Sequence, residues 1–439
     1  MSKSFSILGK NIKANSPADL EPYLSELRAM EDVEEVHFGG NSLGVEACEA
    51  VAEALKGKNN LRIADFADIF TGRLISEIPQ ALSHILSALS SITSLVELDL
   101  CDNAFGGRLA ETLVPFLSSH THFSVLKLNN NGMGPAGGAE IAKALKLNAE
   151  KCKEEGKEAS LRVIVCGRNR LENGSAPSWA EAFRAHPGLR EVRMPQNGIR
   201  MEGIQAIAEG LTGCKSLEHL DLQDNTATKS GTRAIVKSLP SWPSLKHLNL
   251  SDCLLGKAGG IALTTSLRDG SNPKLESLKL QYGEMDGTSV DILAEAIAQH
   301  LENLKVLELN GNRFAEEDEC VERLKKALEE RGHEDALDEC TSPCVRQRCT
   351  DREQWTTWKS PSLTRRRAKR KATVSMMESL MMASFLLSLT SRLTTWPISL
   401  KRCTSRTSRV LECKRVRGVY IACRVMFLSV FQHVIIFVS

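Results

Sequence analysis

A short pattern of leucines followed by an asparagine recurs along the first three-quarters of the sequence. It occurs at residues 98–103, 126–131, 220–225 and 307–312. Within one copy, alternation sends Leu126 and Leu128 to one face of a strand, while Lys127 and Asn129 point to the other. A unit this short cannot bury its apolar face alone, so copies must stack on one another. The pattern predicts a solenoid, in which function would reside on the outward-facing row of side chains.

The spacing of the asparagine identifies the type of solenoid. Its position is occupied, in order, by Asn41, Ile69, Asn103, Asn131, Asn169, Asn197, Asn225, Cys253, Gly283 and Asn312. Five of the nine spacings are 28 residues, which suits the long form of leucine-rich repeat, with a strand, a tight bend and a full helix. In residues 44–55, Ala47, Val51, Ala52 and Leu55 form one helical stripe. The predicted fold class is therefore α/β, a leucine-rich repeat solenoid with parallel strands on the concave face and helices on the convex face.

Two spacings are longer than the repeat. The spacing of 34 residues contains segment 68–79, and the spacing of 38 residues contains the polar segment 151–157. Insertions in solenoids map to loops and often form part of a binding face. We therefore expect a long loop at 68–79 and either a helix extension or a loop at 151–157.

The charge of the chain changes abruptly near residue 340. Residues 1–339 contain 37 Lys+Arg and 50 Asp+Glu, a net charge of −13, whereas residues 340–439 contain 19 and 4, a net charge of +15. Before this change, Val321, Leu324 and Leu328 form the apolar stripe of a charged helix, typical of the cap that ends a solenoid. We predict a repeat domain at 1–339 that ends in a helical cap, followed by a basic, disordered tail at 340–439.

Features of the tail have competing interpretations. Cys340, Cys344 and Cys349 lack a fourth ligand at zinc spacing. The basic segment 365–371 has the composition of a nuclear-import or nucleic-acid patch, and the apolar segment 425–438 is shorter than the ~20 residues that span a bilayer. Runs of Lys and Arg beside Met pairs also arise when the codons of an acidic stretch are read out of frame. Our hypothesis is that residues from about 340 onward are a frameshifted or mis-spliced acidic tail.

The sequence lacks the motifs of a self-contained enzyme. It has no glycine-rich phosphate loop, no HExxH and no GxSxG. His219 and His247 occupy equivalent repeat positions, which favours a structural role. The cysteines of the repeats do not form a secreted disulfide framework, and the N-terminus has no apolar signal core, so we expect an intracellular protein. We predict no cofactor and no metal site.

Two positions are candidates for an exposed functional site. Arg73 lies in the long loop, where Gly72 permits an unusual backbone and Phe70 can anchor the segment. Asn130 precedes Asn131, which fits the structural slot of the repeat, and we expect the amide of Asn130 to be free for a partner. The alternative is an ordinary surface arginine and a solvated turn residue, and the repeat pattern alone favours that alternative in both cases.

Acidic residues recur at outward-facing positions. Examples are Asp99, Asp221 and Glu308 in predicted strands and Asp224 in a bend. We expect them to form a row of negative charge on the strand side. The usual explanation is a solvated face, but a curved surface of one charge sign also suits the attraction of a basic protein partner.

Several segments together resemble the Ran GTPase-activating protein family. They are residues 68–79, 130–135, 166–174, 196–200, 221–226 and 308–314, in order within about 4–339. Family members usually carry a long acidic tail after the solenoid, and residues 334–339 resemble its start. The basic remainder departs from the family pattern, which supports the frameshift hypothesis.

The resemblance implies a protein that activates a Ran-type small GTPase in its GTP form and has no complete active site of its own. Such GTPases carry a catalytic glutamine, which this family is thought to hold against the attacking water without inserting an arginine finger. Asn130 matches the asparagine placed near that glutamine, and Arg73 matches an arginine whose loss impairs activity. We expect Arg73 to position the interface rather than to touch phosphate. The other residues expected at the GTPase interface are Thr71, Gly72, Asn129, Asp102, Arg168, Arg170 and Asp224.

The resemblance also implies a cellular setting. It suggests a role in nucleocytoplasmic transport, a cytoplasmic location with enrichment at the nuclear envelope, and a Ran-binding protein as an additional partner. We expect a monomer, without nucleic-acid or membrane partners. The alternative is a non-catalytic leucine-rich repeat scaffold or inhibitor, similar to ribonuclease inhibitor. Segments 69–73 and 129–131 favour the activator, because a generic scaffold needs neither of them.

Overall fold

The computed structural model describes residues 3–338, 410–412, 421–428 and 431–438. The chain forms two compact units, Met1–Gln347 and Arg348–Ser439. Cys340, Cys344, Cys349 and the basic segment 365–371 lie outside the described residues. The interpretations of those residues therefore stay predictions, as does the domain boundary after residue 339.

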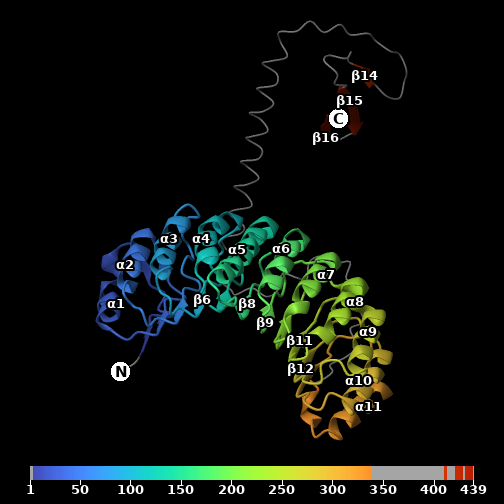
Figure 1. Ribbon diagram of the computed structural model, residues 1–439. Coiled ribbons are helices and arrows are strands. Elements are labelled where there is room, and N and C mark those ends of the chain that lie inside the picture. Colours follow the sequence, from blue (N-terminus) through green and yellow to red (C-terminus); the bar gives the residue numbers. More distant parts are fainter. Residues whose placement is uncertain (1–2, 339–409, 413–420, 429–430, 439) are drawn as a thin grey trace. The chain divides into compact units, whose positions relative to one another are not determined.

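Eleven short parallel strands line the inner side of the arc formed by residues 3–338 (Figure 1). In order across the sheet they are β1 (Ser4–Ser6), β3 (Glu35–His37), β5 (Ile63–Asp65), β6 (Glu97–Asp99), β7 (Val125–Lys127), β8 (Val163–Val165), β9 (Glu191–Arg193), β10 (His219–Asp221), β11 (His247–Asn249), β12 (Ser277–Lys279) and β13 (Val306–Glu308). A smaller parallel sheet pairs β2 (Lys13–Ala14) with β4 (Ser42–Leu43). The spatial order of the strands in the large sheet follows the sequence, as the stacking of repeats requires.

Each inner strand buries its middle residue, and most of the flanking residues are half-buried. Leu98, Leu126 and Ile164 lie in register on β6, β7 and β8, and all three are buried. This is the predicted alternation of a strand with one covered face. The register places equivalent positions of successive repeats side by side, about 4.8 Å apart.

The helices lie on the outer side of the arc (Figure 1). They are α1 (Pro17–Ala29), α2 (Val45–Leu55), α3 (Ile78–Leu89), α4 (Ala110–Ser119), α5 (Gly134–Glu154), α6 (Glu172–Ala185), α7 (Met201–Gly210), α8 (Thr228–Ser238), α9 (Gly256–Arg268), α10 (Gly287–Gln299) and α11 (Glu319–Glu329). Single 3₁₀ turns are η1 (Gly107–Leu109), η2 (Leu211–Gly213), η3 (Leu239–Ser241) and η4 (Glu334–Ala336). The predicted stripe of α2, with Ala47, Val51, Ala52 and Leu55, is buried. The predicted α/β leucine-rich repeat solenoid is confirmed.

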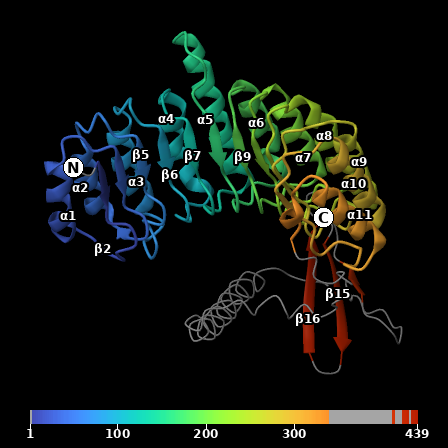
Figure 2. The same cartoon turned by 90° about the horizontal axis from the view of Figure 1, so that it is seen from below.

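The two long spacings have different structures. The extra residues of the first form a loop between β5 and α3, as predicted. The second lengthens α5, which continues to Glu154 and extends beyond its neighbours in Figure 2. Asn148, on this extension, is buried and donates from Nδ2 to Leu117 O at 2.8 Å and to His120 O at 2.9 Å. Of the two alternatives for 151–157, the helix extension is therefore the correct one up to Glu154.

The first strand of the sheet lacks the sequence marker of the repeat. β1 pairs in parallel with β3, but the position that carries asparagine in other repeats is Lys10. Counting asparagines therefore begins one repeat too late. Asn41 nevertheless makes the usual link to the preceding bend, because its Nδ2 donates to Ile7 O at 2.9 Å.

At the other end of the sheet, α11 buries Val321, Leu324 and Leu328 as predicted. After this helix, the chain returns to the last strand, where Asp338 Oδ1 accepts from Leu309 N at 3.1 Å. The edge of β13 is thus partly covered, which limits pairing with other chains.

The second unit contains an antiparallel sheet in the order β14 (Val410–Glu412), β15 (Ile421–Leu428) and β16 (Phe431–Val438). β15 and β16 pair along their full length. Regular structure thus occurs within a segment for which the sequence predicts disorder. The frameshift hypothesis stays a prediction.

Candidate functional site

The candidate residues lie along one edge of the large sheet, where the chain leaves the C-terminal ends of β5 to β10. Thr71, Gly72 and Arg73 follow β5, Asp102 follows β6, Asn129 and Asn130 follow β7, Arg168 and Arg170 follow β8, and Asp224 follows β10. Parallel strands in register bring these segments to the same edge. We name this row the bend edge; it comprises residues 66–77, 100–105, 128–133, 166–171, 194–199 and 222–227.

A buried asparagine fixes most of these bends. Asn131 Nδ2 donates to Leu128 O of its own bend at 3.1 Å and to Leu100 O of the preceding bend at 2.9 Å, while its Oδ1 accepts from Asn103 N at 3.0 Å. Similar links to the preceding bend are made by Asn103, Asn169, Asn197, Asn225 and Asn312. Each asparagine satisfies backbone groups of two repeats, so the structural role predicted for Asn131 is confirmed.

The residue before each asparagine has a left-handed backbone. Its φ is 60° at Asp102, 55° at Asn130, 57° at Arg168, 54° at Gln196 and 54° at Asp224. Asn and Asp tolerate this conformation, whereas arginine and glutamine pay roughly 1 kcal/mol for it. The backbone of the bend is thus common to these repeats, and the side chain at this position differs from one repeat to the next.

Asn130 does not present a free amide, contrary to the expectation from the sequence. Its Nδ2 donates to Asp102 Oδ1 at 2.8 Å, and the residue is half-buried. The two residues meet because they occupy equivalent positions on adjacent strands. The bond orients the carboxamide, and among the described residues none donates a hydrogen bond to Asn130 Oδ1. That oxygen is therefore available as an acceptor.

Asn129 links its bend to the following one. Its Oδ1 accepts from Gly167 N at 2.5 Å, and its own N–H donates to Cys101 Sγ at 3.3 Å. The side chain is half-buried. Asn129 therefore supports the backbone on both sides of Asn130.

Arg73 ties its loop to two earlier parts of the chain. Its Nη1 donates to Asn15 Oδ1 at 2.6 Å, and its Nη2 donates to Ala14 O at 2.6 Å and to Ser42 O. Ala14 ends β2 and Ser42 begins β4, so the guanidinium joins the loop to both strands of the smaller sheet. Arg73 is half-buried and is not an ordinary surface arginine. This geometry fits the positioning role expected for it.

The loop that carries this arginine is also held by its own residues. Phe70 is buried, as expected for the residue that fixes the loop to the core. Ser42 Oγ donates to Thr71 O at 2.9 Å, and Thr71 Oγ1 donates to Asp68 Oδ1. Gly72 has a φ of 79°, in the left-handed region that the sequence led us to expect. Thr71 and Gly72 are exposed.

Two exposed arginines flank a buried asparagine on the next part of the bend edge. Arg168 and Arg170 have φ values of 57° and 55°, on either side of Asn169. No ion pair to either arginine occurs within the described residues. Arginine gains nothing from this conformation, and strained residues concentrate at functional sites. The two guanidinium groups are thus available to a partner.

Asp224 lies three strands beyond Asn130. Gln196 Nε2 donates to Asp224 Oδ2 at 2.7 Å, a pairing between adjacent bends similar to that of Asn130 with Asp102. Asp224 is exposed and has no direct contact with the other candidate residues in the structure. Asp224 therefore lies on the same edge as Asn130 but is not part of one cluster with it.

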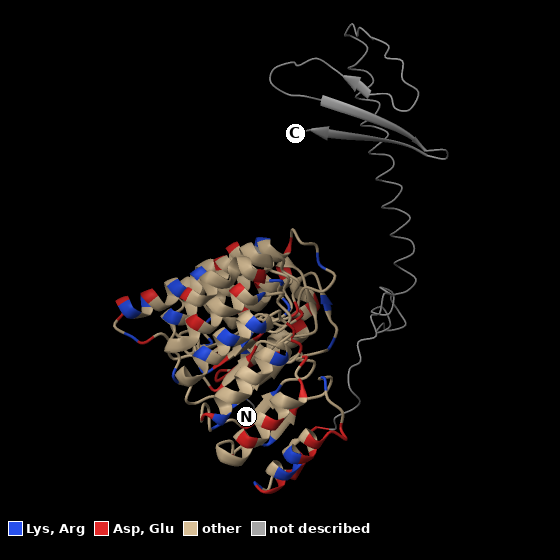
Figure 3. Cartoon of the chain, turned by 90° about the vertical axis from the view of Figure 1, so that its right-hand side faces the viewer, with Lys and Arg blue, Asp and Glu red and all other residues tan. Residues whose placement is uncertain are grey.

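The inner face does not carry the row of negative charge that the sequence suggested. Acidic and basic side chains pair on it, Glu97 with Lys127, Glu191 with Arg193, and Glu308 with Lys279. Over the repeats as a whole, Figure 3 shows Lys and Arg interspersed with Asp and Glu. The prediction failed because it counted acidic positions without the basic residues on neighbouring strands.

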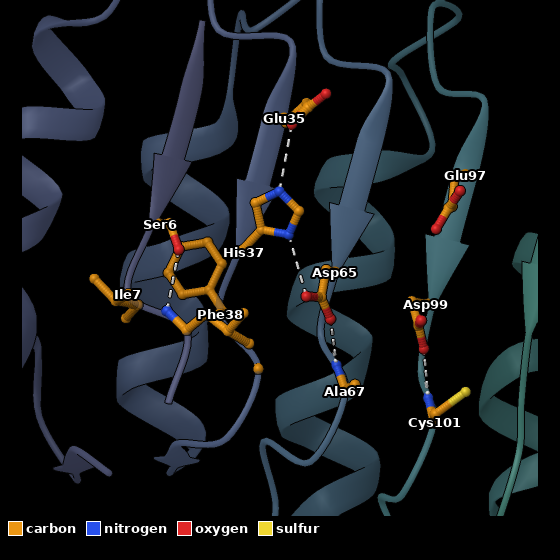
Figure 4. Close-up of polar contacts among 12 residues, drawn as sticks. Ser6, Ile7, Glu35, His37, Phe38, Asp65, Ala67, Glu97, Asp99 and Cys101 are labelled. Atoms are coloured by element: carbon orange, nitrogen blue, oxygen red, sulfur yellow. Dashed lines mark hydrogen bonds and ion pairs between the residues drawn. The ribbon is translucent and has the colours of Figure 1, made fainter. Parts of the chain in front are cut away.

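Several aspartates of the inner face stabilise the bends themselves. Asp65 Oδ1 accepts from Ala67 N at 3.0 Å, Asp99 Oδ1 from Cys101 N at 2.9 Å, and Asp221 Oδ1 from Gln223 N at 3.0 Å. Figure 4 shows the first two of these bonds, together with the His37 ring between Glu35 and Asp65. Burial raises the pKa of the Asp99 and Asp221 carboxyls above the usual range. These carboxylates serve the fold rather than an open binding surface.

In the described part of the chain, no group of three or more His, Cys, Asp or Glu is arranged to hold a metal ion. No helix in the same residues is long and apolar enough to cross a membrane. Burial raises the pKa of the Cys48, Cys166 and Cys253 thiols to about 12, so these thiols stay protonated at neutral pH.

Sequence reasoning missed the residues that surround Arg73. Asn15 and Ser42, which bond to Arg73 and its loop, are far from it in sequence and carry no repeat signal. Leu74 and Ile75, which follow Arg73, are exposed large apolar residues. This apolar pair is visible in the sequence, within the same inserted segment, and could have been noticed there.

Comparison with known proteins finds a leucine-rich repeat family and several Ran GTPase-activating proteins. The family described as "Leucine Rich repeat" matches residues 243–263. Ran GTPase-activating protein 1 of Saccharomyces cerevisiae is 37% identical over 335 residues, covering 74% of this chain and 82% of the yeast protein. The Ran GTPase-activating protein of Drosophila melanogaster is 44% identical over 318 residues, 72% of this chain and 53% of that protein. Ran GTPase-activating protein 1 of Xenopus laevis is 44% identical over 197 residues, 44% of this chain and 34% of that protein, so the chain spans a third to a half of these animal relatives.

Proposed function

The chain belongs to the Ran GTPase-activating protein family, and we propose that it stimulates GTP hydrolysis by a Ran-type small GTPase in its GTP form. In this proposal it has no complete active site of its own. It orders the catalytic glutamine of the GTPase, which then holds the attacking water in line with the γ-phosphate. The partner supplies the nucleotide, the metal ion and the water, and this chain supplies a rigid surface.

The observation that carries the proposal is the bond between Asn130 and Asp102. Asp102 accepts from Asn130 Nδ2, which leaves Asn130 Oδ1 as an oriented acceptor at the bend edge. Such an acceptor suits the side-chain N–H of a glutamine, whose own oxygen can then accept a hydrogen bond from the attacking water and orient it. Fixing these groups before reaction removes part of the entropic barrier. Activating proteins accelerate such GTPases by ~10³–10⁵, which corresponds to about 4–7 kcal/mol of barrier lowering.

The other candidate residues have supporting roles in the proposal. Arg73 positions the loop and does not reach the phosphate, because its guanidinium is bonded to Asn15, Ala14 and Ser42. The residues proposed to contact the GTPase around this centre are Thr71, Gly72, Asp102, Asn129, Arg168, Arg170 and Asp224. The exposed arginines among them suit an acidic or backbone-carbonyl surface of the partner.

The proposal extends to the cellular setting. A cytoplasmic activator, enriched at the nuclear envelope, would keep the GTPase in its GDP form outside the nucleus and so support nucleocytoplasmic transport. It would act as a monomer on the GTPase, with a Ran-binding protein as an additional partner and without nucleic acid or membrane.

Single-turnover hydrolysis tests the proposal. Ran loaded with GTP is mixed with a small molar fraction of the full chain, and phosphate release is followed. We expect an acceleration of at least ~10³. Tight binding without acceleration would instead identify a non-catalytic scaffold or inhibitor. Release of phosphate from GTP by the chain alone would contradict the absence of an active site of its own.

A further inference from the structure

Two consecutive large apolar residues are exposed on the loop that Arg73 holds. Leu74 is 64% exposed and Ile75 is 59% exposed. Single exposed apolar side chains are common on soluble proteins, but adjacent ones on an inserted loop form a patch that water solvates poorly. The pair makes no contribution to the buried core of the repeats.

The backbone beneath this pair is fixed on both sides. Before it, Arg73 donates to Asn15, Ala14 and Ser42. After it, Glu77 N donates to Leu74 O at 3.0 Å. An apolar pair on a held loop loses little conformational entropy when it binds, which favours its use as a docking element.

The pair also adjoins the surface on which the proposed function depends. It follows Arg73 directly on the bend edge, and its loop leaves β5, two strands from β7 and Asn130. At about 4.8 Å per strand, the two bends are roughly 10 Å apart along the edge. One globular partner can therefore cover both.

We infer that Leu74 and Ile75 form an apolar anchor that docks against the Ran-type GTPase in its GTP form. The inference rests on the proposed function and adds to it a binding element and a purpose for the Arg73 bonds, which hold the anchor in place. Two side chains bury far less than the ~1,200 Å² of a stable interface. The anchor therefore needs a contact surface that continues beside it, and the bend edge supplies one. On this basis the GTPase, rather than a second copy of this chain, is the occupant.

An anchor of this kind acts equally on the ground state and the transition state. Its loss should therefore raise KM and leave kcat unchanged, whereas loss of a group that orders the glutamine should lower kcat. We expect Leu74→Ser with Ile75→Ser to raise KM about tenfold, as expected for two half-exposed aliphatic side chains that become buried. The value of kcat should stay within about twofold.

The test measures initial rates of GTP hydrolysis with the full chain at varied concentrations of GTP-loaded Ran. Leu147→Ser is the matched control, because Leu147 is 51% exposed on the extension of α5, away from the bend edge. Its KM should equal that of the unmodified chain. Thermal unfolding of each variant confirms that the substituted residues leave the fold unchanged.

Each outcome decides between the inference and the proposed function. No acceleration by the unmodified chain overturns the proposed function. Acceleration by the unmodified chain, with an unchanged KM in the double variant, overturns the anchor alone. A fall in kcat at constant KM also overturns it, since the pair would then act on the reacting groups. If the double variant kept its KM but lost a self-association that the unmodified chain shows in sedimentation, a second copy of this chain would be the partner that binds the apolar pair.

Discussion

Two segments of the bend edge, the loop 70–77 and the bend 129–131, are held in place by different means. The bend depends on its neighbours in the stack, through bonds of Asn130 to Asp102 and of Asn131 to the backbone of the preceding bend. The loop depends on Arg73, which reaches residues 31, 58 and 59 positions away in the sequence. One arrangement follows from the repeat, and the other is specific to this insertion.

In the bend, different residues stabilise the fold and act on the partner, whereas in the loop one residue does both. In the bend, Asn131 is buried and holds the backbone, whereas Asn130 stands at the surface with its Oδ1 unused. In the loop, Arg73 both satisfies carbonyl oxygens of the smaller sheet and fixes the exposed residues that follow. We therefore expect substitutions in the bend to affect either stability or activity, and substitutions at Arg73 to affect both.

The largest expected effect is that of Asn130→Gly on the catalysed rate. Glycine accepts the left-handed backbone without cost, so the substitution removes the carboxamide and leaves the bend intact. We expect kcat to fall by ~10²–10³, as for the loss of one oriented polar group at a reacting centre. Single-turnover hydrolysis by GTP-loaded Ran measures it.

Binding provides the counterpart measurement for this variant. The dissociation constant of the complex with a non-hydrolysable GTP form should change by less than about threefold. Asp252→Gly, at the equivalent left-handed position four repeats later and outside the bend edge, is the matched control and should retain the full rate. Equal losses of rate and affinity in Asn130→Gly would reduce Asn130 to an ordinary contact.

Asn131→Ala should show the opposite behaviour one residue along the chain. It leaves Asn103 N without its acceptor and opens a cavity among the buried asparagines that link the bends. The free energy of unfolding should therefore fall by about 2–4 kcal/mol. Urea unfolding measures the loss. The catalysed rate per folded molecule should stay within a few-fold of normal. A fall in rate comparable to that of Asn130→Gly would mean that the two roles in the bend are not separable.

Arg73→Lys should impair both stability and activity, because an ammonium cannot reproduce the forked contacts to three acceptors. We expect kcat/KM to fall by ~10–100, the cost of a small misplacement of the interface. The free energy of unfolding should fall by about 1–3 kcal/mol. Stopped-flow hydrolysis and thermal unfolding measure the two changes. Loss of activity with full thermal stability would show that Arg73 acts on the partner directly.

The sequence predicts the repeat well because the physical signal is local. The strand, the bend and the helix each leave a pattern within one 28-residue unit. The fold class, the structural role of Asn131 in its bend and the cap helix with Val321 could therefore be predicted. The repeat also places Asn130 on a defined edge of the sheet. Among the strands of the large sheet, only β1 was missed, since Lys10 stands at its marker position.

Contacts between repeats were beyond such local patterns. The bond of Asn130 to Asp102 depends on which residues share a row, and the charge of the inner face depends on Lys127 and other basic residues of neighbouring strands. Two helices separate Asn15 and Ala14 from Arg73 and one separates Ser42 from it, and no periodicity connects them. None of these three partners was a candidate in the sequence analysis.

Asn15→Ala is the smallest and most specific test of the difference between loop and bend. It removes one neutral acceptor of Arg73, while Ala14 O and Ser42 O remain in place. A single hydrogen bond of this kind is worth about 0.5–1.5 kcal/mol, so kcat/KM should fall by only about 2–10-fold, through looser positioning of the loop.

The matched control is Asn60→Ala, which removes a surface bond to Asp32 remote from the loop and should have no effect on the rate. Combining Asn15→Ala with Arg73→Ala should add nothing to the loss caused by Arg73→Ala alone, because both act through the same contact. Additive losses in that double-mutant cycle would place Asn15 in direct contact with the GTPase, and the loop would then depend on more than its arginine.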